Sequence, residues 1–118
     1  MNQTAPALTC DLTRLTAAQR QCLEAVVAEL FASSHELNVL PDGYALGYPD
    51  ASAETISKIA QFIAYDRLCC GFLTHALVSE PSGGPTWLRI TGSGAKEVIA
   101  AYMKRFILPG AAIAGDPL

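Results

Sequence analysis

The hydrophobic positions of this chain change their period several times, and each change predicts a boundary between elements. In "TAAQRQCLEAVVAELFASS", apolar residues recur every three or four positions from Cys22 to Phe31, which is the spacing of one face of an α-helix. Thr16 stands immediately before this pattern, and its hydroxyl can cap the first turn. We therefore expect a helix that starts after Thr16 and ends near Ser34.

Two other segments have the pattern of β-hairpins. "HELNVLPDGYALGYP" combines an alternating strand with the turn Pro41-Asp42-Gly43, in which we expect Gly43 to supply a positive φ. "FLTHALVSEPSGGPTWLRITG" predicts a second hairpin, with residues 81–85 as its loop. Both hairpins supply strands that pair antiparallel.

Helical patterns also follow each hairpin. "DASAETISKIAQFIAYDRLCC" predicts a second helix, capped by Asp50 or Ser52 and ended by Gly71. A third helix is expected from about Ser93 to Leu108.

The resulting order is helix, hairpin, helix, hairpin, helix. It predicts an α+β fold with four mainly antiparallel strands and three helices packed on one face of the sheet. The two halves align strand on strand and helix on helix, which favours an internal duplication. We expect a loose leader over 1–13, a single domain over 14–108 and a tail over 109–118.

Composition narrows the class of protein. The chain has 118 residues, of which 51% are hydrophobic and 16% charged, so one domain with a substantial core is expected. The net charge of −3 and the lack of a basic patch argue against nucleic-acid binding. The N-terminus does not resemble a signal peptide, and no apolar run is long enough to cross a membrane. We expect a cytoplasmic protein without a membrane partner, whose high apolar content favours a homodimer or a protein partner.

The cysteines are the most distinctive candidates for chemistry. Because the cytoplasm keeps thiols reduced, Cys10, Cys22, Cys69 and Cys70 are expected to be free or metal-bound rather than a disulfide framework. Cys22 and Cys70 lie on the apolar side of their predicted helices. The alternative interpretation is therefore that both are buried core cysteines.

The segment "IAYDRLCCGF" places an acid, a base and two thiols at the end of the second helix. At about 100° per residue, Cys70 falls on the apolar side of the helix, with Asp66 and Arg67 at its two edges, whereas Cys69 points elsewhere. The two thiols converge on one ion only if the helix unwinds at Cys69-Cys70, which Gly71 makes possible.

A soft metal ion is the ligand that this set of side chains favours. Cys69 and Cys70 supply thiolates, and His75 on the next strand supplies a nitrogen, so these three are the candidate ligands for zinc, copper, mercury or arsenic(III). Arg67 stabilises a nearby thiolate, whereas Asp66 and the helix C-terminus oppose it. The spacing is not a standard zinc pattern, and a fourth ligand stays open among a partner chain and three residues: Cys10, Cys22 and Asp66.

Two alternatives stand beside metal binding. In a structural or protein-interaction module, Asp66 and Arg67 would brace the helix while the cysteines pack. A thiol-dependent enzyme ranks third, because no Cys/His pair forms a known catalytic arrangement and no phosphate-binding glycine loop is present. We therefore assign no catalytic residue and no cofactor-binding residue, and a soft metal ion is the candidate cofactor.

The second half of the chain resembles a family of small bacterial proteins of uncharacterised function, and the first half does so loosely. The family pattern is an acid-Arg-x-Cys-Cys-Pro-Phe segment, then a hairpin ending in Leu-x-x-Thr-Gly and a last helix. The matching positions here are Asp66, Arg67, Cys69, Cys70, Gly71, Phe72, Leu88, Thr91 and Gly92. The chain departs from the pattern at Gly71, where Pro is usual, and at Asp66, where Glu is commoner. Similar segments are appended to transcription regulators of the mercury-resistance type, so the resemblance implies a role with thiophilic metals and names no reaction.

Overall fold

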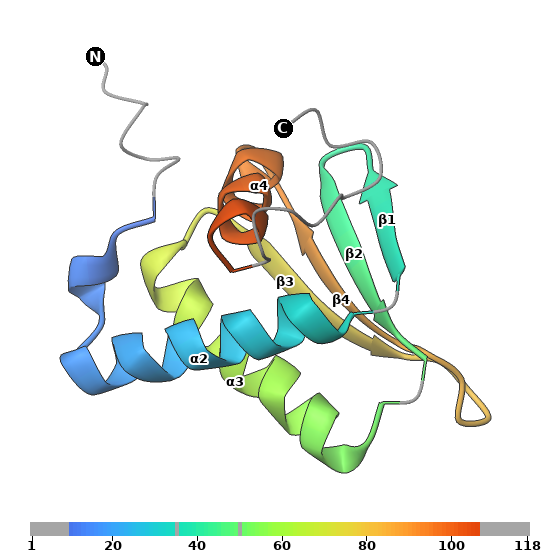
Figure 1. The fold of residues 1–118 in the computed structure, drawn as a ribbon. Helices are drawn as coiled ribbons and strands as arrows, with labels where there is room; N and C mark the ends of the chain where they lie inside the picture. Colours follow the sequence, from blue (N-terminus) through green and yellow to red (C-terminus); the bar gives the residue numbers. More distant parts are fainter. Residues whose placement is uncertain (1–9, 35, 50, 107–118) are drawn as a thin grey trace.

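The computed structural model describes residues 10–34, 36–49 and 51–106, and its centre is a four-stranded antiparallel sheet. The strands are β1 (Glu36–Leu40), β2 (Gly43–Tyr48), β3 (Thr74–Ser79) and β4 (Thr86–Thr91). They lie in the order β1-β2-β4-β3, so each hairpin contributes one central and one edge strand (Figure 1). The central pair runs from Gly43 opposite Thr91 to Tyr48 opposite Thr86.

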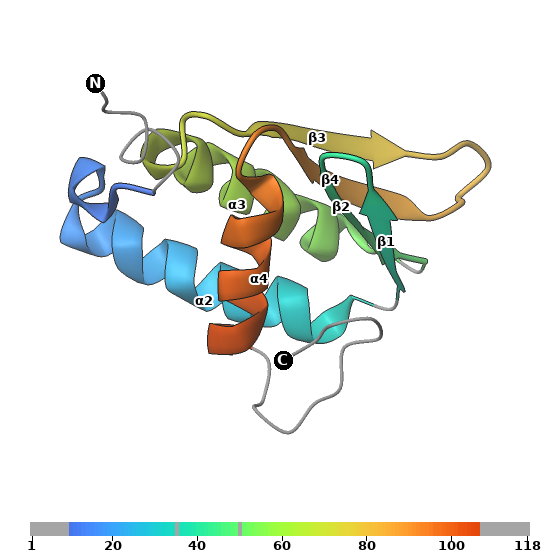
Figure 2. The ribbon, with the colours of Figure 1, turned by 90° about the horizontal axis from the view of Figure 1, so that it is seen from above.

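Three α-helices cover one face of this sheet. They are α2 (Ala17–Ser33), α3 (Ala53–Cys69) and α4 (Ala95–Phe106), preceded by a short 3-10 turn, η1 (Leu12–Arg14). Seen from above, α4 crosses over α2, and α3 lies between α2 and the sheet edge formed by β3 (Figure 2). The α+β class, with three helices and a four-stranded antiparallel sheet, is therefore confirmed.

The helix starts follow the expected capping chemistry. Thr16 caps α2 in a reciprocal capping box with Gln19, in which each side chain accepts the other residue's backbone N–H. Ser52 caps α3 by accepting the N–H of Thr55 at 3.1 Å, while the other expected cap, Asp50, lies outside the described residues. Leu108, the leader over 1–9 and the tail over 109–118 lie outside them too.

Gly43 is required for a reason other than the predicted one. The hairpin turn occupies Pro41 and Asp42, and Gly43 is the first residue of β2, without a positive φ. A Cβ at Gly43 would instead overlap the carbonyl oxygen of Ile90 on the neighbouring β4. Close approach of two backbones therefore selects glycine here.

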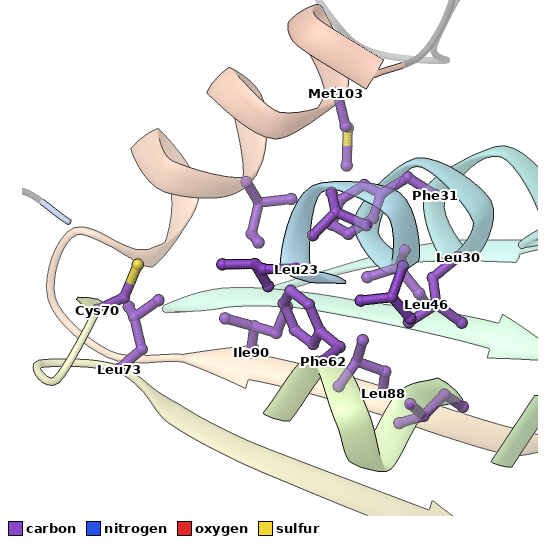
Figure 3. Close-up of a cluster of buried hydrophobic side chains, with 14 of the residues drawn as sticks. Leu23, Leu30, Phe31, Leu46, Phe62, Cys70, Leu73, Leu88, Ile90 and Met103 are labelled. Carbon is purple, nitrogen blue, oxygen red and sulfur yellow. The ribbon is translucent and has the colours of Figure 1, made fainter. Parts of the chain in front are cut away.

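The core lies between the sheet and the helices. Phe62, Leu88 and Ile90 are fully buried at its centre, and Cys70 and Leu73 lie together at one end of the cluster (Figure 3). Each helix contributes buried side chains; those of α2 are Leu23, Val26, Val27, Leu30 and Phe31. The segment that contains Cys70 and Leu73 therefore lies at the edge of the core and not on the surface.

The buried face of α3 differs from the predicted one. It consists of Ile59, Phe62, Asp66 and Cys69, whereas the sequence pattern placed Asp66 at an edge of the apolar side and Cys69 away from it. The large Phe62 ring is fully buried in the core, and the rotation of the helix directs it there. As a result, Asp66 and Cys69 face inward, and Arg67 is exposed.

Within the described ranges, no helix is both long and apolar enough to span a lipid bilayer.

Candidate thiol site at the end of helix α3

The last turn of α3 brings its two cysteines together. Cys69 is the final helical residue, and Cys70 leaves the helix with φ −113° and ψ 61°. The N–H of Cys70 still donates to the Asp66 carbonyl at 2.8 Å, so the departure is a single change of dihedral angles at the cap. The two sulfur atoms lie 3.8 Å apart, because the backbone unwinds one residue before Gly71.

A third cysteine joins them from the start of the chain. Cys10 forms a disulfide with Cys70, from which it is 60 positions distant in sequence, and the N–H of Asp11 donates to the Cys69 carbonyl at 2.8 Å. The described part of the predicted leader, from Cys10 onward, therefore packs against the end of α3. The expectation that the four cysteines are free or metal-bound is wrong for this pair, since the fold places the two thiols within bonding distance.

The fourth cysteine lies apart from the cluster. Cys22 and Cys69 are the free thiols among the described residues, and Cys22 is exposed on α2. The expectation of Cys22 as a core residue is wrong, because α2 buries the neighbouring Leu23 and turns the Cys22 side chain toward solvent. Cys22 is for this reason a convenient control position.

The sulfur atoms of Cys10, Cys69 and Cys70, which we call the thiol cluster, all lie within 4.8 Å of one another. Cys69 and Cys70 are 3% and 0% exposed, whereas Cys10 is half-buried. Burial, and after it the charge of the nearby Asp66 carboxylate, raises the pKa of the Cys69 thiol to about 11. The free thiol of the cluster is therefore protonated at neutral pH.

A buried carboxylate adjoins the cluster. Asp66 is 0% exposed, and its Oδ1 accepts a hydrogen bond from the Tyr102 hydroxyl of α4 at 2.5 Å. Its Oδ2 lies 2.7 Å from Nε2 of His75 on β3, whose side chain is 3% exposed. Asp66 thus joins α3, α4 and β3 through one carboxylate.

This network reaches the disulfide directly. The Cys70 sulfur lies 3.6 Å from Asp66 Oδ1 and 3.8 Å from the Tyr102 hydroxyl. The rings of Phe62 and Phe31 pack edge-on around Tyr102, and Phe62 also packs edge-on against His75, with ring centroids 5.7 to 6.4 Å apart. Apolar surroundings strengthen such hydrogen bonds and make an unpaired partner costly.

The predicted site residues therefore occupy three different positions. Cys69 and Cys70 belong to the thiol cluster, with Cys10 as its third sulfur. His75 and Asp66 hydrogen-bond each other beside it, and Arg67 is exposed at the surface.

The sequence left Cys10 as one of several candidates for a fourth ligand, and it did not indicate Tyr102 as a member of the site. The position of Tyr102 on the inner face of an amphipathic helix is a sequence signal for such a role, because the hydroxyl of a buried tyrosine needs a hydrogen-bond partner.

No protein-family model, curated protein or solved structure matches this chain. The geometry of the thiol cluster and of the Asp66 network is accordingly the basis for the functional argument.

Proposed function

We propose that this protein binds a soft metal or metalloid ion, such as mercury(II), copper(I), zinc(II) or arsenic(III), through the reduced thiols of Cys10, Cys69 and Cys70. The observation that carries the proposal is the approach of three sulfur atoms to within 4.8 Å of one another. Thiolates select soft ions over hard ones, and the described residues contain no other such group of metal-ligating side chains.

The sulfur separation suits a shared ion. A metal–sulfur bond of about 2.3 Å places the sulfur atoms of a three- or four-coordinate site roughly 4 Å apart. The Cys69 and Cys70 sulfurs are already 3.8 Å apart. Reduction of the Cys10–Cys70 disulfide frees the sulfurs of Cys10 and Cys70 as ligands, so binding requires a reducing environment. We therefore propose the cytoplasm as the location of the protein.

His75 takes a supporting place in this proposal. The sequence-based hypothesis put it among the ligands, but its Nε2 is occupied by Asp66 at 2.7 Å. We propose that His75 and Asp66 fix the end of α3, from which Cys69 and Cys70 project, as outer partners fix ligands in metal sites. Arg67, exposed on the same turn, is proposed to add only long-range positive charge.

A titration of the reduced protein tests the proposal. The Cys22→Ser protein is the reference, because an exposed thiol such as Cys22 can bind soft metals by itself. Under oxygen-free conditions, native mass spectrometry with added mercury(II) should give one tightly held ion per chain. The protein should no longer bind this ion when Cys69 and Cys70 are both replaced by Ser. The Cys10→Ser protein should bind the ion more weakly. Equal binding by the double variant and the reference overturns the proposal.

A second candidate function rests on a separate observation, the bridging of three elements by Asp66. If the cluster merely packs and Asp66 braces α3 against β3 and α4, the module would act through protein partners or as a homodimer. In that case the reduced reference protein binds no metal, its buried thiols react only on unfolding, and the same mass spectra report a dimer or a captured partner.

We also propose that the fold arose by duplication of a hairpin–helix unit. The support is the strand order β1-β2-β4-β3, in which the two hairpins meet through their second strands, β2 and β4. Superposition of residues 36–69 on 74–106 should place β1 on β3 and β2 on β4. A best superposition in any other register would contradict it.

A further inference from the structure

Cys10 is less buried than the other two cysteines of the thiol cluster. In the disulfide, Cys70 is 0% exposed and Cys10 is half-buried. The remaining thiol, Cys69, is 3% exposed. Thiol–disulfide exchange requires a thiolate to attack one of the two bonded sulfurs, and the rate depends on which sulfur can be reached. Cys10 is therefore the more exposed of the two residues that form this disulfide.

We propose that the Cys10–Cys70 disulfide exchanges with small external thiols, and that Cys10 is the sulfur at which they enter. The exchange goes beyond metal binding and does not depend on it, since no ion takes part. It is a second activity of the same cluster, and it determines how many of the sulfurs are free thiols.

The exchange consists of two balanced steps. The thiolate of the external thiol forms a bond to the Cys10 sulfur, the Cys10–Cys70 bond breaks, and its electron pair passes to the Cys70 sulfur. Cys70 takes up one proton, which balances the one lost by the external thiol. A second external thiol then attacks the external sulfur of the mixed disulfide. The products are the external disulfide and a protein with Cys10 and Cys70 both reduced.

The surroundings of Cys70 suit a leaving sulfur that stays in place. Once reduced, the Cys70 thiol has the Asp66 Oδ1 within 3.6 Å as an acceptor, and the Tyr102 hydroxyl lies 3.8 Å away. Cys70 is also tied by its backbone, whose N–H donates to Asp66 and whose carbonyl accepts from Leu73 at 3.1 Å. The N–H of Asp11, next to Cys10, donates to the Cys69 carbonyl at 2.8 Å, which holds Cys10 beside the end of α3. The two sulfurs therefore stay close after reduction, and the reverse reaction reforms the same pair.

The test uses the metal-free Cys22→Ser protein, in which the exposed thiol can no longer react. Air-oxidised protein should carry one disulfide, seen as the loss of two hydrogen atoms in intact mass. A short exposure to reduced glutathione, quenched with acid and mapped by peptide mass spectrometry, should place the glutathione adduct on Cys10. Adducts on Cys69 or Cys70 at a similar level, or oxidised protein without the Cys10–Cys70 bond, overturn the proposal.

Two variants test whether Cys10 is the residue that external thiols attack. In Cys70→Ser, Cys10 has lost its disulfide partner, so oxidised glutathione should form a mixed disulfide at Cys10. Cys10→Ser leaves only buried thiols, and its modification should be slower by roughly tenfold or more, because access limits exchange. Circular dichroism checks that both variants are folded. If the Cys10→Ser protein is folded and reacts as fast as Cys70→Ser, Cys10 is not the entry point. Metal binding could fail in its own titration while this exchange succeeds, so the two proposals are tested independently.

Discussion

Reduction of the Cys10–Cys70 disulfide should lower the free energy of unfolding by about 4 kcal/mol. The bond closes a loop of 60 positions, and the loss of chain entropy in the unfolded state for a loop of that length amounts to roughly 4 kcal/mol at 25 °C. A domain of this size has a total stability of about 5–15 kcal/mol, so the reduced protein should stay folded but be much closer to its threshold.

Urea denaturation of the Cys22→Ser protein, with and without a reductant, measures this difference. With a dependence on urea of about 1–3 kcal/mol per M, the midpoint should fall by roughly 1–4 M on reduction. Cys10→Ser is the matched control, because its midpoint should not respond to the reductant and should lie near that of the reduced reference. A loss of less than about 1 kcal/mol on reduction would refute the long-range link between the N-terminal segment and α3.

Three further predictions concern the surroundings of the site and the sheet. Tyr102→Phe keeps the ring but removes the hydroxyl that donates to Asp66, so urea denaturation should show a loss of about 1.5–3 kcal/mol, and a loss under 0.5 kcal/mol would contradict a role for this bond. Gly43→Ala should lower the midpoint of thermal unfolding by the equivalent of about 1–3 kcal/mol, because the new methyl group would overlap the backbone of β4. Gly71→Ala should be nearly neutral, because a Cβ there has only an ordinary contact at 3.8 Å. Equal effects of the two substitutions would contradict the close approach of β2 and β4 at Gly43. Burial raises the pKa of Tyr48 from its ordinary value of 10.0, so the folded state holds this proton more tightly than the unfolded state, and stability should fall as the pH rises above 10.0. Tyr48→Phe should remove the part of this alkaline loss that Tyr48 causes. An unchanged loss in Tyr48→Phe would show that other groups cause it.

Local patterns predicted most of the fold. The capping box at Thr16 and the period of the apolar residues after it define α2 without reference to the rest of the chain. The hairpin at Pro41 and Asp42 follows equally from turn chemistry and alternation. These elements depend on interactions between residues that are close in sequence, which a sequence pattern records directly.

The site depends on contacts that no local pattern records. The pairing of Cys10 with Cys70 spans 60 positions, and the bond from Tyr102 to Asp66 joins two different helices. The rotation of α3 was mispredicted because Asp66 was treated as an edge residue, whereas its two partners allow a carboxylate to occupy the buried stripe. The two adjacent cysteines are visible in the sequence, but only the folded chain shows that Cys10 lies beside them.

The measurement that tests the central claim most directly is X-ray absorption spectroscopy of mercury bound to the reduced Cys22→Ser protein. Our account predicts a shell of three sulfur atoms in this protein, and two in Cys10→Ser, because Cys10, Cys69 and Cys70 share one ion. A nitrogen ligand in the shell, or a sulfur count that Cys10→Ser leaves unchanged, would contradict it.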